Sequence, residues 1–121
     1  GTPVVALRAG KPFLAIGAPG GRRVISGVFQ CLLNMMEYGM GPGEAIGEPR
    51  VHCEGAKVDV DSRLPAAVRD GLRARGHELV ERVETPVQSS FARPNAIMVD
   101  PDTGVLRGGV TPFGPATAIG V

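Results

Sequence analysis

Short apolar runs separated by turns rich in glycine and proline make up most of this 121-residue chain. Residues 3–8 and 12–17 are almost wholly apolar, and the Ala-Gly-Lys sequence between them is typical of a turn. Two such runs in succession predict a β-hairpin. Because both arms contain few polar residues, we expect strands that are buried on both faces.

The longest helical pattern follows directly. Apolar residues recur every three or four positions over residues 22–38. Gly39 comes just after them, where a left-handed residue commonly ends a helix. Gly27 lies inside the pattern, although glycine in a helix costs about 1 kcal/mol relative to alanine. We therefore expect another element to pack closely against the helix at Gly27.

Shorter patterns of both kinds fill the rest of the chain. One short helix is expected at 42–46, and another is expected to begin at an N-cap, Ser62, and to run to Arg75. Strands are expected at residues 50–53, 56–60, 78–83, 95–99 and 105–108. This order of elements predicts an α+β or layered α/β fold whose sheet faces are covered by helices.

Length and composition narrow the class of protein. The chain, residues 1–121, has the length of a single domain. With 13 basic and 12 acidic residues and 4% aromatic residues, it lacks the dense basic surface that nucleic acid requires. No apolar run approaches the roughly 18 residues of a membrane-spanning helix, so no membrane span is predicted. Two cysteines do not form a disulfide framework, and we interpret Cys31 and Cys53 as buried thiols.

The segment from Gly17 to Arg23 carries the candidate chemistry. Gly20 and Gly21 follow a proline and open the long helix. The N–H groups at a helix start have no internal partner and lie at the positive end of the helix dipole. Without Cβ atoms in the way, such N–H groups can bind an anion or stabilise an oxyanion that forms during a reaction. A plain strand-to-helix turn that needs glycine is the alternative, while nucleotide binding is disfavoured by the spacing.

Several segments in one consistent order resemble the γ-glutamyltransferases (γ-glutamyltranspeptidases). Residues 17–25, Gly-Ala-Pro-Gly-Gly-Arg-Arg-Val-Ile, resemble the family's Gly-Ser-Pro-Gly-Gly-Ser-Arg-Ile-Ile. Residues 49–52, Pro-Arg-Val-His, and 95–99, Asn-Ala-Ile-Met-Val, resemble Pro-Arg-Phe-His and Gln-Ser-Ile-Met-Val. The resemblance covers residues 2 to about 108 and identifies the chain as the C-terminal part of a small subunit.

The resemblance implies a specific fold and chemistry. Members are N-terminal nucleophile hydrolases with a four-layer αββα sandwich, made from a precursor that cleaves itself into a large and a small subunit. The N-terminal Thr of the small subunit attacks a γ-glutamyl amide such as glutathione, and the acyl group passes to water or to an amino acid. Gly20 and Gly21 map onto the glycines of the oxyanion hole. No cofactor is implied, and the partners are the large subunit, the rest of the small subunit and the γ-glutamyl substrate.

The family's nucleophile segment does not occur in this chain. Thr2 is not expected to replace it, because Gly1 precedes it and the resemblance places it at the start of a strand. The isolated chain is therefore expected to be inactive, and to self-associate because its parent's other layers are missing. A relative acting on another amide, and a non-enzymatic module that binds an anion or a protein, stay open as alternatives.

Other polar residues are weaker candidates. Arg22 and Arg23 could line the mouth of an anion site, or lie solvated at the helix start. Asp59 and Asp61 share one face of a predicted strand, and a solvated sheet edge explains them best.

His52 and Cys53 are neighbours on a predicted strand. Their side chains should point to opposite faces, so they are expected to be structural and not a nucleophile–base pair. No metal site is predicted, because these residues and His77 lack ligand spacing.

Overall fold

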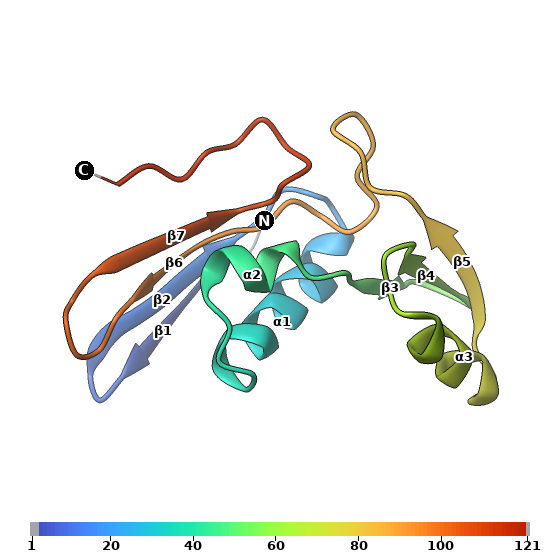
Figure 1. Cartoon of the computed structure of the whole chain (residues 1–121), viewed down its shortest axis with the longest axis horizontal. Coiled ribbons are helices and arrows are strands. Elements are labelled where there is room, and N and C mark those ends of the chain that lie inside the picture. Colours follow the sequence, from blue (N-terminus) through green and yellow to red (C-terminus); the bar gives the residue numbers. More distant parts are fainter. Residues whose placement is uncertain (1–2, 121) are drawn as a thin grey trace.

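The computed structural model of the chain describes residues 3–120. Within that range it contains β1 (Val4–Arg8), β2 (Lys11–Gly17), α1 (Arg23–Met36), α2 (Pro42–Gly47), β3 (Val51–Cys53), β4 (Lys57–Asp61), α3 (Ala66–Ala74), β5 (Glu78–Arg82), β6 (Asn95–Val99) and β7 (Leu106–Val110). Figure 1 shows a larger sheet with α1 and α2 beside it, and a smaller sheet with α3. The α+β fold class expected from the sequence, with helices and sheets together, is confirmed.

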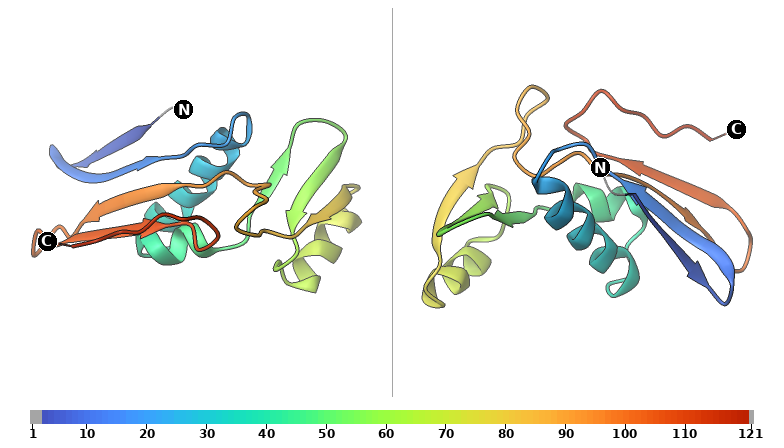
Figure 2. Two further views of the ribbon diagram at one scale, coloured as in Figure 1. Left: turned by 90° about the horizontal axis from the view of Figure 1, so that it is seen from above. Right: turned by 180° about the vertical axis from the view of Figure 1, so that it is seen from behind.

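The larger sheet has the strand order β1-β2-β6-β7 and is antiparallel throughout. The two predicted hairpins, β1–β2 and β6–β7, are both present. Pairing of β2 with β6 joins them, although about eighty residues of sequence separate the two strands. Sequence-distant segments therefore lie side by side, as both views in Figure 2 show.

The main core lies between this sheet and the two helices α1 and α2. The helices contribute apolar residues at helical spacing, and the sheet contributes Phe13, Leu14 and Ile16 of β2 and Ala96 of β6. The buried members are Phe13, Leu14, Ile16, Val24, Val28, Cys31, Met35, Ala45, Ile46, Ala92 and Ala96. Fully burying one large aliphatic side chain contributes about 1.5–3 kcal/mol, so this layer is the main source of stability in the described chain.

The opposite face of the larger sheet is open. Val5, Ala15 and Ile97 form one cross-strand row and are exposed, Val5 to 69% and Ile97 to 51%. The prediction that β1 and β2 are buried on both faces is therefore wrong for this chain. The reason is that α1 and α2 cover only one face, and the other face holds a cavity of about 590 Å³ partly bordered by the C-terminal tail.

The smaller sheet has the order β3-β4-β5, with β3 and β4 antiparallel and β4 and β5 parallel. α3 connects the two parallel strands, as such a crossover requires. β4 is the central strand, so the interpretation of Asp61 as part of a solvated edge is wrong. Asp61 is 2% exposed, and the Arg63 guanidinium donates to its carboxylate at 2.8 Å.

Helix ends and packing follow local sequence rules in part. α1 ends at Met36, two residues before the predicted end, and Gly39 lies in the turn that follows, with the left-handed φ of 67° expected there. A Cβ on Gly27 would lie 3.0 Å from the Phe91 carbonyl oxygen, which confirms the close approach expected there. Ser62 is not an N-cap: α3 begins at Ala66 without a side-chain cap. The Ser62 N–H instead donates to the Arg82 carbonyl and extends the β4–β5 ladder.

Candidate functional site

The glycine pair forms the turn from β2 into α1. Gly20 has φ 142° and Gly21 has φ 59°, backbone conformations that residues with a Cβ rarely adopt. The carbonyls of both glycines accept the first bonds of the helix, from Arg23 at 3.2 Å and Val24 at 3.3 Å. The pair therefore lies directly in front of the first helical turn, as the sequence predicts.

The N–H groups of the pair are not used inside the chain. Within residues 3–120, neither the Gly20 nor the Gly21 N–H donates a hydrogen bond, and both residues are exposed. The first turn of α1 carries no acidic residue, and its N-cap, Arg22, makes no side-chain cap bond. The positive end of the helix dipole is therefore not neutralised, which favours a negatively charged oxygen at this position. The two glycines line neither the cavity of about 590 Å³ nor a second one of about 350 Å³.

One neighbour holds the turn from behind. A Cβ on Gly20 would lie 2.8 Å from the Ala92 Cα atom, so only glycine fits there. The Arg93 N–H donates to the Pro19 carbonyl at 3.1 Å. A Cβ on Gly21, by contrast, would meet nothing within 4 Å, so Gly21 borders open space.

The two arginines after the pair have different surroundings. Arg22 is a surface residue whose side chain is 88% exposed and lies 3.7 Å from the Glu54 carboxylate. Arg23 is half-buried and lines the 350 Å³ cavity together with His52, Glu54 and Lys57. Arg23 thus lies beside a cavity one residue from the helix cap, whereas Arg22 is mostly solvated.

His52 connects α1 to the β3–β4 turn. Its Nδ1 lies 2.6 Å from the Ser26 hydroxyl and its Nε2 lies 2.8 Å from a Glu54 carboxylate oxygen. The His52 bond lowers the pKa of Glu54 below its usual value. His52 is buried and Cys53 exposed, which confirms that the two side chains point to opposite faces. The Ser26 partner was not predicted, because it lies 26 residues away on another element.

The cysteines differ in burial. Cys31 lies in the core between α1 and the sheet, and burial raises the pKa of its thiol. Cys53 is exposed, so the prediction of a buried thiol is wrong for Cys53. In the described part of the chain, no group of three or more His, Cys, Asp and Glu side chains is placed to hold a metal ion. None of the described helices is both long and apolar enough to cross a membrane.

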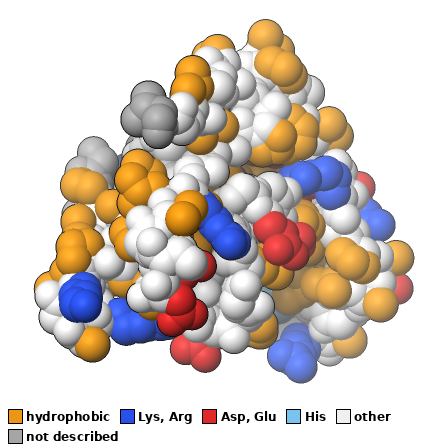
Figure 3. Space-filling model, turned by 60° about the vertical axis from the view of Figure 1, so that its left-hand side comes forward, with side chains coloured by type: hydrophobic (Ala, Val, Ile, Leu, Met, Phe, Trp, Pro, Cys, Tyr) orange, Lys and Arg blue, Asp and Glu red, His pale blue; other side chains and the backbone are white. Residues whose placement is uncertain are grey.

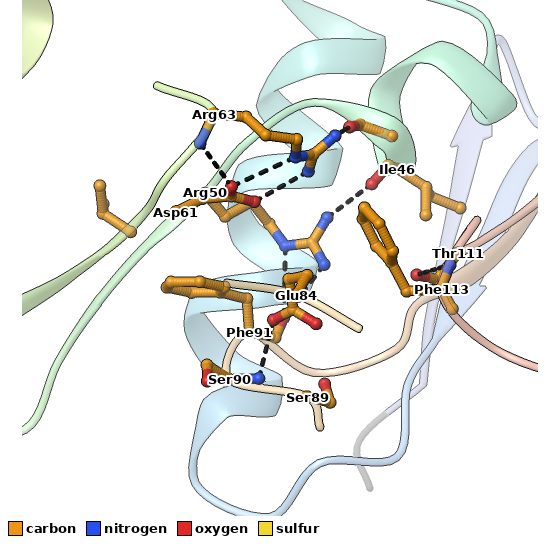
Figure 4. A network of polar contacts seen from close by, with 12 residues as sticks. Ile46, Arg50, Asp61, Arg63, Glu84, Ser89, Ser90, Phe91, Thr111 and Phe113 are labelled. Carbon is orange, nitrogen blue, oxygen red and sulfur yellow. Dashed lines mark hydrogen bonds and ion pairs between the residues drawn. The ribbon is translucent and has the colours of Figure 1, made fainter. Parts of the chain in front are cut away.

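Arg50 is a second residue for which sequence reasoning assigned no role. It is buried, and its guanidinium donates to backbone carbonyls of Ile46 and Phe91. Figure 4 shows Arg50 at the centre of a polar network between α2 and the segment before β6. The neighbours of Arg50 in sequence, a proline before it and a short strand after it, do not indicate that its side chain is buried.

The described chain thus combines a four-stranded antiparallel sheet, helices on one of its faces and a glycine turn into the main helix. A sequence model of the family described as Gamma-glutamyltranspeptidase matches residues 1–121. The chain belongs to the γ-glutamyltranspeptidase family.

Individual relatives agree with this assignment. The chain is 34% identical over 106 residues to the Acylase ACY 1 proenzyme of Pseudomonas sp. (strain SE83), covering 88% of this chain and 18% of the relative. It is 31% identical over 121 residues to the Glutathione hydrolase proenzyme of Bacillus subtilis subsp. natto, covering 99% of this chain and 20% of the relative. The chain therefore spans about a fifth of the length of these relatives and is part of a larger protein.

Solved structures show the same fold. A mutant of Helicobacter pylori γ-glutamyltranspeptidase matches with a TM-score of 0.80 and 32% identity, over 92% of this chain and 59% of that one. Cephalosporin acylase from Bacillus halodurans matches with a TM-score of 0.83 and 29% identity, over 93% of this chain and 20% of that one. The expected assignment to N-terminal nucleophile hydrolases is confirmed.

Proposed function

We propose that this chain is the C-terminal part of an enzyme that cleaves γ-glutamyl amides such as glutathione and passes the acyl group to water or an amino acid. In this proposal the nucleophile comes from the rest of the protein. The chain contributes the helix α1, the larger sheet and the N–H groups of Gly20 and Gly21, which stabilise the oxyanion of the tetrahedral intermediate.

The observation that carries the proposal is the unused pair of N–H groups at the uncapped start of α1. Two donors in one turn, next to an unneutralised helix dipole, suit an oxygen on which negative charge develops. Removing one donor from an oxyanion hole typically lowers kcat by about 10²–10³-fold. The glycines are therefore the residues of this chain whose replacement should affect the chemical step most.

The first test compares two glycine replacements in the full-length protein. Gly21→Ala and Gly10→Ala each place a Cβ on a left-handed residue with nothing within 4 Å, so both add similar backbone strain. We expect Gly21→Ala to lower kcat for a γ-glutamyl anilide by about 10- to 100-fold, because the strained turn redirects the amides. Gly10→Ala, in the β1–β2 turn, should change only stability. Equal kcat values for the two variants would contradict the role of the glycine pair.

The second test concerns the chain by itself. We expect residues 1–121 alone to release no anilide above the uncatalysed rate, since the nucleophile is not among them. Full-length protein at the same molar concentration is the positive control. Turnover by the isolated chain would show that a nucleophile lies within it and would refute this division of roles.

A second candidate substrate class is suggested by relatives named as acylases. If the full-length protein hydrolyses an acylated cephalosporin and leaves γ-glutamyl anilide intact, the same oxyanion donors serve another amide. Steady-state kcat/KM for both substrates, measured with one enzyme preparation, distinguishes the two.

A further inference from the structure

Arg50 is a buried cation without an acidic partner. Arg50 is 6% exposed, and among the described residues no carboxylate forms an ion pair with it. Arginine stays protonated in proteins, and burying its charge is unfavourable unless its donors are satisfied. An apolar side chain at this position would leave the carbonyls that accept its hydrogen bonds without a partner, so Arg50 satisfies and restrains buried backbone groups.

The groups that it holds are backbone carbonyls from two distant segments. Nη1 donates to the Ile46 carbonyl at 2.7 Å, at the end of α2. Nε and Nη2 both donate to the Phe91 carbonyl, at 3.2 and 3.1 Å, and Nη2 also reaches the Ala92 carbonyl at 3.4 Å. Figure 4 shows this fork bridging the two segments. Such planar, multiply bonded geometry is specific to a guanidinium and is not reproduced by lysine.

The segment held by Arg50 is the one that packs behind the glycine pair. The Cα atom of Ala92 lies where a Cβ on Gly20 would come within 2.8 Å of it. Ala92 itself has φ 63°, an unfavourable conformation for a residue with a Cβ, which persists only where the surroundings impose it. Arg50 supplies that restraint from one side.

The other side of the segment rests on α1. A Cβ on Gly27 would lie 3.0 Å from the Phe91 carbonyl oxygen, which is the same oxygen that accepts two bonds from Arg50. The Phe91 carbonyl is thus confined between the helix and the guanidinium. Movement of this carbonyl would carry Ala92 away from Gly20.

We infer that Arg50 is a positioning residue for the reaction: through Phe91 and Ala92 it fixes the backbone of Gly20 and the directions of the two glycine N–H groups. This inference rests on the proposed function of the glycine pair. Oxyanion donors must be held close to their productive geometry, and a displacement of about 1 Å can lower the rate by about 100-fold.

The test uses the full-length protein with Arg50→Lys and a matched control, Arg63→Lys. Arg63 also binds a backbone carbonyl, that of Gly47, and a buried acid, but it makes no hydrogen bond to residues 91–93. Arg50→Lys keeps the positive charge, which limits the loss of stability, but it removes the planar set of guanidinium donors. We expect kcat on a γ-glutamyl anilide to fall by about 10- to 100-fold in Arg50→Lys with little change in KM. Arg63→Lys should lose stability but keep kcat.

A double-mutant cycle separates positioning from general destabilisation. If Arg50 acts through the glycine pair, Arg50→Lys should cost much less in a Gly21→Ala background than in the wild type, since the geometry is already lost there. In a Gly10→Ala background its full effect should remain. Independent, multiplying effects with Gly21→Ala would overturn the inference.

Amide hydrogen exchange supplies a readout that does not depend on activity. The Arg23 and Val24 amides, which donate to the carbonyls of Gly20 and Gly21, should exchange about tenfold faster in Arg50→Lys than in Arg63→Lys, because the turn is released. Unchanged exchange, or a kcat within about twofold of Arg63→Lys, overturns the inference. If instead Gly21→Ala leaves kcat intact, the proposed function fails, and the exchange rates still decide whether Arg50 holds the turn.

Discussion

At the scale of single residues, His52 shows how one buried side chain joins two elements through both of its ring nitrogens. A carboxylate only accepts hydrogen bonds, so the nitrogen facing Glu54, Nε2, must carry a proton. The other ring nitrogen, Nδ1, lies 2.6 Å from the Ser26 hydroxyl, which also donates to the Arg23 carbonyl at 3.3 Å. His52 therefore links the first part of α1, one turn after the glycine pair, to an acid on the β3–β4 turn.

This link predicts a pH-dependent contribution to stability. The hydrogen bond from His52 lowers the pKa of Glu54 from its ordinary 4.5. A lowered folded-state pKa means stability that is present above pH 4.5 and is lost as the pH falls through the folded value. In full-length protein we expect Glu54→Gln to lower the melting temperature slightly near neutral pH, with the difference from wild type shrinking to nothing in acid.

Glu37→Gln is the matched control, because Glu37 forms no ion pair among the described residues. Its difference from wild type should stay small across the same pH range. A Glu54→Gln difference that grows as the pH is lowered would have the opposite sign to the expected one.

Single residues were predictable from sequence where a local rule applied. A turn was predictable at Gly20, Gly21 and Gly39 from the residues next to them in sequence. The burial of Arg50 and Asp61 was not predictable in this way. Arg50 bonds mainly to a distant segment. The Asp61 carboxylate is satisfied by Arg63, only two residues away, but its burial depends on the central place of β4 in the smaller sheet. Phe91 lies 41 residues from Arg50 in sequence, and no local pattern records such a contact.

At the scale of elements, the contact between α1 and residues 91–92 controls where a side chain is tolerated. Gly27 and Gly71 are both inside helices, but only at Gly27 would a Cβ have close neighbours: the Phe91 carbonyl oxygen at 3.0 Å and the Ala92 Cβ at 3.2 Å. Alanine at an open helical position stabilises by up to about 1 kcal/mol. Overpacking costs about 1–3 kcal/mol.

We therefore expect opposite effects from two identical substitutions. Gly71→Ala should raise the free energy of unfolding by up to about 1 kcal/mol, and Gly27→Ala should lower it by about 1 kcal/mol despite the better helix propensity. Denaturant unfolding of the full-length protein, followed by a signal from this part of the chain, measures both. If Gly27→Ala stabilised the protein, residues 91–92 would have to move aside at little cost in free energy, and this prediction would be wrong.

Elements were predicted best where hydrophobic period and turn residues agree. α1 and the two hairpins were predicted for that reason. The start of α3 was misplaced because the backbone of Ser62 pairs with Arg82, and this long-range bond overrides a local N-cap preference. The central position of β4, and hence the burial of Asp61, depends on strand order, which the sequence of the strand itself does not encode.

At the scale of the whole molecule, two apolar surfaces are left partly or wholly uncovered within residues 3–120. One is the open face of the larger sheet, with Val5 69% exposed. The other is the outer side of α1, where Ile25 and Phe29 are 76% and 59% exposed and four residues apart. Figure 3 shows one face of the molecule on which the upper part carries hydrophobic and uncharged groups and few charges. Surfaces of this kind are normally covered by other protein.

The isolated chain is therefore predicted to self-associate. Light scattering should give a mass above 12.5 kDa that rises with concentration. Val5→Lys combined with Ile25→Lys should shift the distribution toward the monomer. Val87→Ser, which changes a valine that is 95% exposed in a loop, should not. A monomer at every concentration would contradict the prediction.

The sequence by itself determined the local events: the hairpins, the long helix with the left-handed turn at Gly39 after it, and a glycine turn with two N–H groups at the helix start. These depend on interactions within a few residues, where period and backbone preference decide the outcome. Only the tertiary structure decided which sheet face is covered, why Asp61 and Arg50 are buried, and what holds the glycine turn in place. Those outcomes depend on contacts between segments that are distant along the chain, and their free energy comes from packing and hydrogen bonds that exist only after the segments have met.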